Sequence, residues 1–100
     1  MTRQDIIRKL KAVEPAIRAQ GAAGLYLFGS YARNAARKDS DVDIFVDKDP
    51  TRSFGFDEFM EIYETIQRAL GKNTTVGYST REGLSPFVRS DIEKEAVKIF

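Results

Sequence analysis

The sequence predicts an α/β (α+β) fold in which a small mixed sheet of three or four strands is flanked by helices. Segments with apolar residues at helical spacing alternate along the chain with short β-like runs. No internal repeat, low-complexity run or linker interrupts this alternation. At 100 residues the chain is long enough for one domain, so we expect a single domain spanning residues 1–100.

The first helix is predicted over residues 3–20. Thr2 and Asp5 have the spacing of an N-terminal capping box, with an acidic residue in place of the usual glutamate. Pro15 lies inside this segment and is expected either to kink the helix or to begin a second short one. The apolar residues that recur at spacings of four, three and four on one helical face are Ile6, Leu10, Val13 and Ile17.

Two strands and a short helix are expected next. The apolar run 25–28 lies between glycines and predicts a buried strand, and residues 31–37 are expected to form a short helix. In the second strand the apolar residues of one face are Val42, Ile44 and Val46. The other face carries Asp41, Asp43, Phe45 and Asp47.

The second half of the chain predicts a long helix over 56–70, ended by Gly71, and a third strand over 74–79. Ser85-Pro86 is expected to begin a final helix. Its predicted apolar face consists of Phe87, Val88, Ile92, Ala96 and Ile99.

Three aromatic residues in this half allow two interpretations. We expect Phe56 to lie in the core and Phe54 to pack within its loop. The alternative is that both, together with Tyr78, belong to a surface that binds a partner.

The composition restricts the chemistry that the chain could perform. It has no cysteine and no histidine, which excludes disulfides, thiolate zinc sites and an imidazole base. An oxygen-only site favours hard metals such as magnesium or manganese. The net charge of +1 argues against a general nucleic-acid binder. No apolar stretch is long enough for a membrane span and the N-terminus does not resemble a secretory signal, so a cytoplasmic location is expected.

Asp41 and Asp43 are the first candidate site residues. Alternation places both carboxylates on one face of a strand, roughly 6–7 Å apart. Two crowded anions are unfavourable unless a cation lies between them, and a divalent metal is the natural partner. Taken alone, however, an Asp-x-Asp pair is more often a solvated strand face.

Gly29-Ser30 favours a binding site over a solvated strand face. This pair follows a buried strand and opens a predicted helix, where backbone N–H groups and the serine hydroxyl can bind phosphate oxygens. Ten residues, 31–40, separate it from Asp41. The two elements together could hold a nucleoside triphosphate with its metal.

The run from Gly29-Ser30 to Asp41-Val42-Asp43 resembles the motif of the DNA polymerase beta-like nucleotidyltransferase superfamily, and most of all its minimal nucleotidyltransferase group. Arg33 and Ser40 also fit that group's pattern. The resemblance implies transfer of a nucleoside monophosphate to an acceptor hydroxyl, with Asp41 and Asp43 binding magnesium. The residues that it implies for binding the triphosphate, here ATP, are Gly29, Ser30, Arg33 and Ser40.

The chain departs from this pattern at Gly77. The superfamily usually carries a third carboxylate on a later strand, and by this resemblance Gly77 occupies its position. Three explanations remain open. The carboxylate is lost and only nucleotide binding is retained, another acidic residue replaces it, or this acceptor does not require it. The acidic residues that could substitute are Asp47, Asp49 and Glu82.

The resemblance also implies a partner. Small members of this group are similar to antitoxins that add AMP to a tyrosine of a HEPN-type ribonuclease toxin. Two alternatives are an antitoxin that neutralises its partner by binding alone, and a nucleotidyltransferase acting on a small molecule or a nucleic acid. The last would normally need an acceptor-binding domain, for which 100 residues leave no room.

Overall fold

A computed structural model describes residues 1–100 and confirms the mixed α/β architecture. The helices are α1 (Arg3–Lys11), α2 (Glu14–Ala19), α3 (Gly29–Ala32), α4 (Phe56–Leu70) and α5 (Arg89–Glu95). The strands are β1 (Ala22–Phe28), β2 (Val42–Lys48), β3 (Val76–Thr80) and β4 (Val97–Lys98). The sheet order is β3-β2-β1-β4, with β1 antiparallel to β2 and β4, and β2 parallel to β3.

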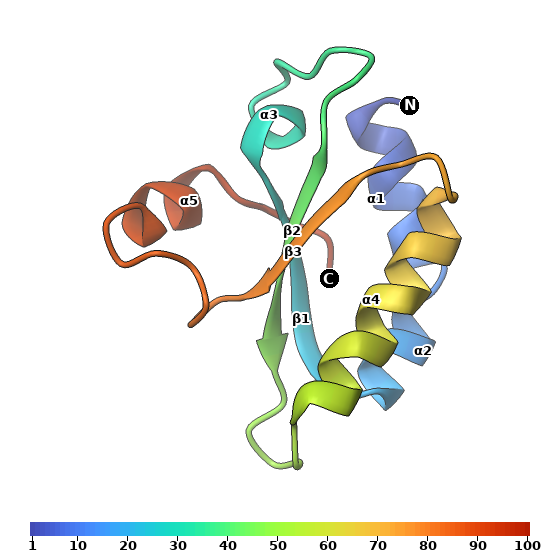
Figure 1. Ribbon diagram of the computed structural model, residues 1–100, viewed down its shortest axis with the longest axis vertical. Helices are drawn as coiled ribbons and strands as arrows, with labels where there is room; N and C mark the ends of the chain where they lie inside the picture. The colour runs from blue at the N-terminus through green and yellow to red at the C-terminus, as the bar shows by residue number, and fades with distance from the viewer.

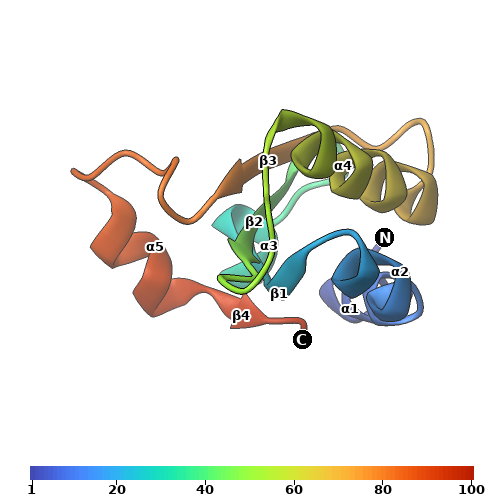
Figure 2. The same ribbon diagram turned by 90° about the horizontal axis from the view of Figure 1, so that it is seen from below.

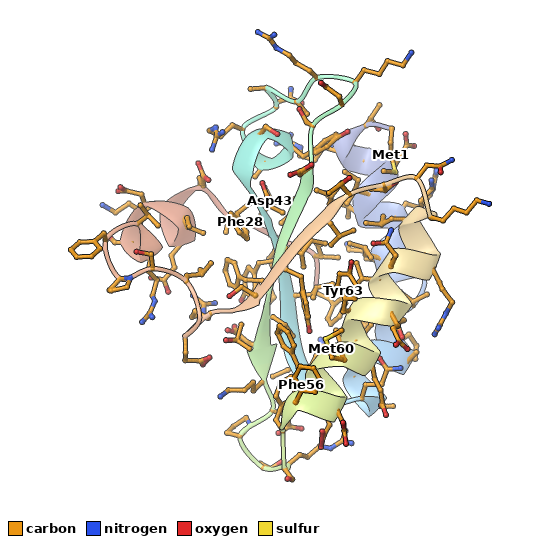
Figure 3. All side chains as sticks on the ribbon, viewed as in Figure 1. Met1, Phe28, Asp43, Phe56, Met60 and Tyr63 are labelled. Carbon is orange, nitrogen blue, oxygen red and sulfur yellow. The ribbon has the colours of Figure 1, made fainter.

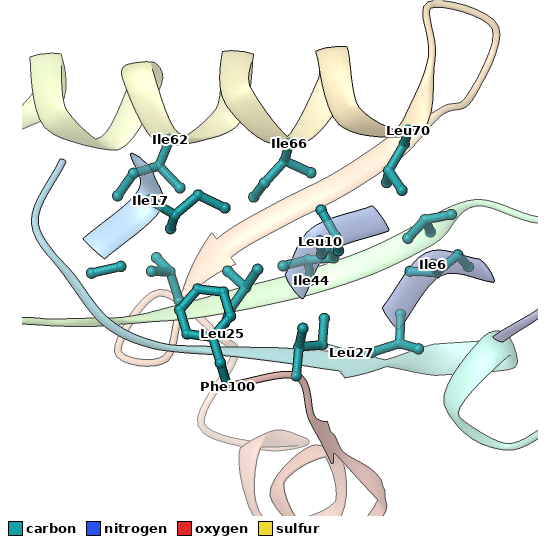
Figure 4. Packing of buried hydrophobic residues seen from close by; sticks show 14 of the residues in the cluster. Ile6, Leu10, Ile17, Leu25, Leu27, Ile44, Ile62, Ile66, Leu70 and Phe100 are labelled. Atoms are coloured by element: carbon teal, nitrogen blue, oxygen red, sulfur yellow. The ribbon is translucent and has the colours of Figure 1, made fainter. Parts of the chain in front are cut away.

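The two faces of the sheet are covered differently. Helices α1, α2 and α4 lie on one face, α5 lies on the other, and α3 sits at one end of the strands (Figure 1, Figure 2). The apolar core lies between the sheet and helices α1, α2 and α4 (Figure 4). Side chains from β2 that point into it are those predicted from alternation, Val42, Ile44 and Val46. None of the helices is long and apolar enough to cross a membrane.

Three of the residues expected to begin or end helices do so. Thr2 and Asp5 form a reciprocal capping box at the start of α1. Of the two alternatives for Pro15, the structure shows the second, because Pro15 lies in the first turn of a separate helix, α2. Gly71 ends α4 with a φ of 100°, a backbone conformation that favours glycine.

The prediction for the final helix was wrong at both ends. Helix α5 begins at Arg89 rather than Pro86, and Phe87 is 92% exposed instead of lying on a buried face. The helix also ends at Glu95, after which Val97–Lys98 pair with β1 as a fourth strand. Hydrogen bonds to β1, such as Ile99 N–H to the Leu25 carbonyl at 2.8 Å, replace the helical bonds that the apolar spacing predicted.

Two further predictions need correction. The helix expected over 31–37 is instead the four-residue α3, which begins at Gly29 and ends at Ala32. Asn34, two residues beyond its end, has a positive φ of 60°, which the helix cannot contain. Phe56 is 75% exposed at the start of α4, so it is not a core residue (Figure 3). Phe54 does pack against the core cluster from its loop, as expected.

Candidate functional site

Three strands meet at one end of the sheet and bring distant residues together. Phe28, the last residue of β1, pairs with Asp43 of the antiparallel strand β2. Asp43 in turn pairs with Gly77 of the parallel strand β3. Asp43 therefore lies between the beginning of α3 and the beginning of β3, next to Phe28 in Figure 3.

The Asp43 carboxylate lies against two glycines. A Cβ on Gly29 would collide with Asp43 Oδ2, and a Cβ on Gly77 would lie 2.5 Å from Asp43 Oδ1. Gly29 also has a φ of 75°, so its backbone conformation favours glycine independently of the space around it. The absence of side chains at these two positions is what allows the carboxylate to occupy this slot.

The surroundings of Asp43 are unfavourable for a negative charge. Burial raises the pKa of the Asp43 carboxyl above its ordinary value, and the nearby charges of Asp41 and Glu95 raise it further. The positive charge of the Arg33 guanidinium lowers the pKa of Asp43. Asp41 is exposed and immediately precedes β2. Two carboxylates close enough to affect each other form a site that a cation would stabilise.

The Gly29 turn already holds an anion. The Gly29 backbone N–H donates to Glu95 Oε1 at 3.2 Å, and Arg33 Nη1 donates to both Glu95 oxygens at 3.1 and 3.2 Å. Ser30 lies half-buried in the next position of the same turn. The structure thus places Gly29, Ser30 and Arg33 together, and it shows that the turn accepts a carboxylate.

Sequence reasoning missed Glu95. It lies in the segment that was expected to continue as a helix to Ile99, and it was not among the candidate site residues. The available signal was its place in the stretch 92–97, which also resembles the minimal nucleotidyltransferases. That resemblance did not indicate which side chain faces Gly29.

Ser40 lies on the loop before β2, apart from the other predicted phosphate-binding residues. Its Oγ accepts a hydrogen bond of 2.7 Å from the Arg37 backbone N–H, which shapes the loop leading to Asp41. Arg37 and Lys38 are exposed on this loop. Ser40 also lines a mostly polar pocket of about 230 Å³, whose other lining residues come mainly from the 38–40 and 73–75 loops.

None of the three substitutes proposed for the third carboxylate lies beside Asp43. Both oxygens of Asp47 accept hydrogen bonds from Arg81, at 2.7 and 2.9 Å. Asp49 Oδ1 accepts from the backbone N–H and hydroxyl of Thr51, beyond the end of β2. Glu82 is an exposed residue beyond the far end of β3. The acidic residue that does approach the site is Glu95.

The donor set fits a metal ion that arrives together with a triphosphate. No group of three or more acidic or other metal-binding side chains converges to hold an ion. Magnesium in nucleotide sites is commonly held by one or two carboxylates, with phosphate and water oxygens completing its coordination. Asp41 and Asp43 could supply those carboxylates.

The fold and this end of the sheet define the class of the protein. The family model of the nucleotidyltransferase domain matches residues 7–99, which is nearly the whole chain, and the protein belongs to this family. The mixed sheet and its helices are thus those of a nucleotidyltransferase domain.

Individual relatives agree with this assignment. A Methanocaldococcus jannaschii protein, provisionally named a protein adenylyltransferase, is 34% identical over 74 residues, or 73% of this chain and 72% of its own. A structure provisionally named a minimal nucleotidyltransferase superposes with a TM-score of 0.78 at 28% identity, covering 97% of this chain and 95% of its own.

A more distant structure shares the fold. It is a tri-AMPylated Shewanella oneidensis HEPN toxin in complex with its MNT antitoxin. It matches with a TM-score of 0.64 at 17% identity, covering 99% of this chain and 72% of that one.

Proposed function

We propose that this protein is an antitoxin of the nucleotidyltransferase type, which transfers AMP from ATP to a tyrosine hydroxyl of a HEPN ribonuclease toxin in the cytoplasm. The observation that carries the proposal is the convergence of the Gly29 turn and the Asp43 carboxylate at one end of the sheet. The name of the Methanocaldococcus jannaschii relative supports a protein as the acceptor. The shared fold with a HEPN-bound antitoxin supports the kind of partner.

The proposed reaction is an in-line displacement at the α-phosphorus of ATP. A bond forms between the tyrosine oxygen and the α-phosphorus, and the hydroxyl proton passes to solvent. The bond from that phosphorus to the α,β-bridging oxygen breaks, and pyrophosphate leaves with that oxygen. The Gly29 N–H, Ser30 and Arg33 would bind and orient the triphosphate. Ser40 would act less directly, by holding the loop that positions Asp41.

Asp41 and Asp43 would hold Mg²⁺, or Mn²⁺ in its place. The ion would supply charge stabilisation for the attacking and leaving oxygens. The raised pKa of Asp43 is consistent with this role, because burial and the neighbouring Asp41 carboxylate disfavour its negative charge and a bound cation would favour it.

A second candidate function is an antitoxin that binds nucleotide and partner without transfer. The observation in its favour is Gly77, which pairs with Asp43 where the resemblance predicts a third carboxylate. In this case neutralisation of the toxin would depend on occlusion by the bound antitoxin.

The deciding experiment is intact-mass measurement of a candidate HEPN toxin, taken from the same genome, after co-expression with this protein. Modification is expected to add one or more AMP units in the presence of the wild-type protein. The Asp41→Asn/Asp43→Asn variant is expected to leave the toxin mass unchanged. An unmodified toxin in a tight, neutralised complex with the wild-type protein would instead establish the binding-only candidate.

A further inference from the structure

Helix α5 is attached to the sheet mainly through charged side chains. None of its residues is buried, in contrast to the other helices. At its middle, Glu93 accepts a hydrogen bond of 2.6 Å from Arg81, which also binds Asp47. At its C-terminal end, Glu95 binds Arg33 and the Gly29 backbone. The helix thus has two ion-pair attachments, one of which uses the proposed nucleotide site.

The Glu95 attachment uses groups that the triphosphate would require. The Gly29 N–H and the Arg33 guanidinium are both directed at the Glu95 carboxylate in this structure. A carboxylate and a phosphate present similar oxygens to such donors, and the two compete for them. The Gly29 backbone has one N–H, so a phosphate oxygen bound there would replace Glu95 Oε1.

We propose that Glu95 is an internal occupant of the phosphate site, and that binding of a nucleoside triphosphate displaces it and frees the C-terminal end of α5. This inference rests on the proposed function only in assigning the Gly29 turn to the triphosphate. Glu95 would then lower the affinity of the site for nucleotide. Nucleotide binding would also weaken the attachment of α5 to the Gly29 turn.

The charges favour displacement over shared occupancy. Asp41, Asp43 and Glu95 already place several negative charges around the turn. The positive charge of Arg33 opposes the effect of Asp41 and Glu95 on the pKa of Asp43. A metal-bound triphosphate brings its own cation, whereas Glu95 would remain as an additional anion. The Glu95 side chain is 25% exposed and that of Arg33 is 54% exposed, so both have room to move apart.

The chain on either side of Glu95 restricts the movement. Ala96 adopts an extended backbone conformation directly after the helix, and β4 then pairs with β1. Ile99 and Phe100 are buried, which holds the end of the chain in place. The Glu93–Arg81–Asp47 attachment lies away from the Gly29 turn. Displacement would therefore loosen the last turn of α5 without detaching β4.

Calorimetric titration with a non-hydrolysable ATP analogue and Mg²⁺ tests the inference. Glu95→Gln removes the charge at the same size and should bind the analogue about five- to tenfold more tightly than wild type, since a hydrogen bond to a charged group has been weakened. Glu93→Gln, which makes the same charge change on the same helix, should bind within about twofold of wild type.

The possible results are distinguishable. Equal or weaker binding by Glu95→Gln would overturn the inference, because Glu95 would then be neutral or assist binding. An equal gain for Glu93→Gln would also overturn it, because the effect would be one of general charge. If neither wild type nor Glu95→Gln binds the analogue, the proposed function fails as well. If wild type binds but transfers no AMP, only the proposed activity fails.

Hydrogen exchange on the wild-type protein provides a test that needs no variant. The Ala96 N–H donates to the Ile92 carbonyl at 2.9 Å in the last turn of α5. This amide should exchange at least about threefold faster when the analogue is bound, while amides of α4 keep their rates. Unchanged or slower exchange at Ala96 would contradict the release of the helix end.

Discussion

The two faces of the sheet differ in what covers them. Under α1, α2 and α4 the side chains are apolar and completely buried, as for Leu10, Ile44 and Ile66. On the opposite face Phe45 is also fully buried, but it is covered by the Tyr26 ring at 4.8 Å and the Arg81 guanidinium, and α5 contributes no buried residue. Asp43, Asp47 and Arg81 share this second face.

This difference indicates a division of roles between the faces. Apolar burial supplies most of the free energy of folding, so the first face carries the stability of the domain. The second face keeps charged groups beside a single lightly attached helix, where ligands could replace internal contacts. Elements with few buried contacts are those that open most readily in native proteins.

The largest expected effect belongs to the charged face and concerns activity. Asp41→Asn combined with Asp43→Asn should lower AMP transfer by about 10³-fold or more, because loss of metal binding removes several kcal/mol of transition-state stabilisation. The thermal unfolding temperature should not fall, since neither side chain belongs to the apolar core. Radiolabel transfer to the toxin and circular dichroism measure the two quantities. Substantial remaining transfer would show that the metal site is misassigned.

The next largest expected effect concerns stability and compares one isoleucine from the helices on each face of the sheet. Ile66→Ala on α4 should lower the free energy of unfolding by about 2–5 kcal/mol, because it leaves a cavity in the core. Ile92→Ala on α5 should cost only about 1 kcal/mol, because that side chain is half-buried. Urea denaturation of both variants measures the difference. Equal losses would mean that α5 contributes as much to stability as α4.

A smaller effect separates the two glycines at the site. Gly29→Ala should destabilise the fold by about 1–3 kcal/mol, since alanine tolerates a φ of 75° poorly and its Cβ would collide with Asp43. Gly77→Ala has no such backbone penalty and should mainly push the Asp43 carboxylate aside. Both variants should lose AMP transfer, while denaturation should show a clear stability loss for Gly29→Ala alone. A comparable loss for Gly77→Ala would mean that Asp43 cannot move.

The smallest expected effect is a gain in stability rather than a loss. Because the pKa of Asp43 is raised, its charged form is disfavoured in the folded state, and the resulting destabilisation is present above the raised pKa and absent below the ordinary value of 3.8. Asp43→Asn should therefore raise the unfolding temperature slightly at pH 7 in metal-free buffer. At pH 3 the variant and the wild type should unfold at similar temperatures. A lower unfolding temperature at pH 7 would show that the Asp43 charge stabilises the fold.

Features that depend on neighbouring residues could be predicted from the sequence. The capping box at Thr2, the end of α4 at Gly71 and the alternation that separates Asp43 from Ile44 all follow from spacings of a few residues. The Gly-Ser and Asp-x-Asp pairs were also evident from such short spacings, and their binding of a triphosphate with its metal stays a prediction.

Features that depend on distant contacts could not be predicted in this way. Ile92, Ala96 and Ile99 have the apolar spacing of a helix, but segment 97–98 pairs with β1. Phe56 fits a helical core pattern but points to solvent. Glu95 contacts Gly29 across 66 residues. A local pattern records the preferences of a segment, whereas these outcomes depend on which partner the folded chain brings alongside it. The motif at Gly29 and Asp43 was therefore evident in the sequence, and the anion that already occupies its turn was evident only after folding.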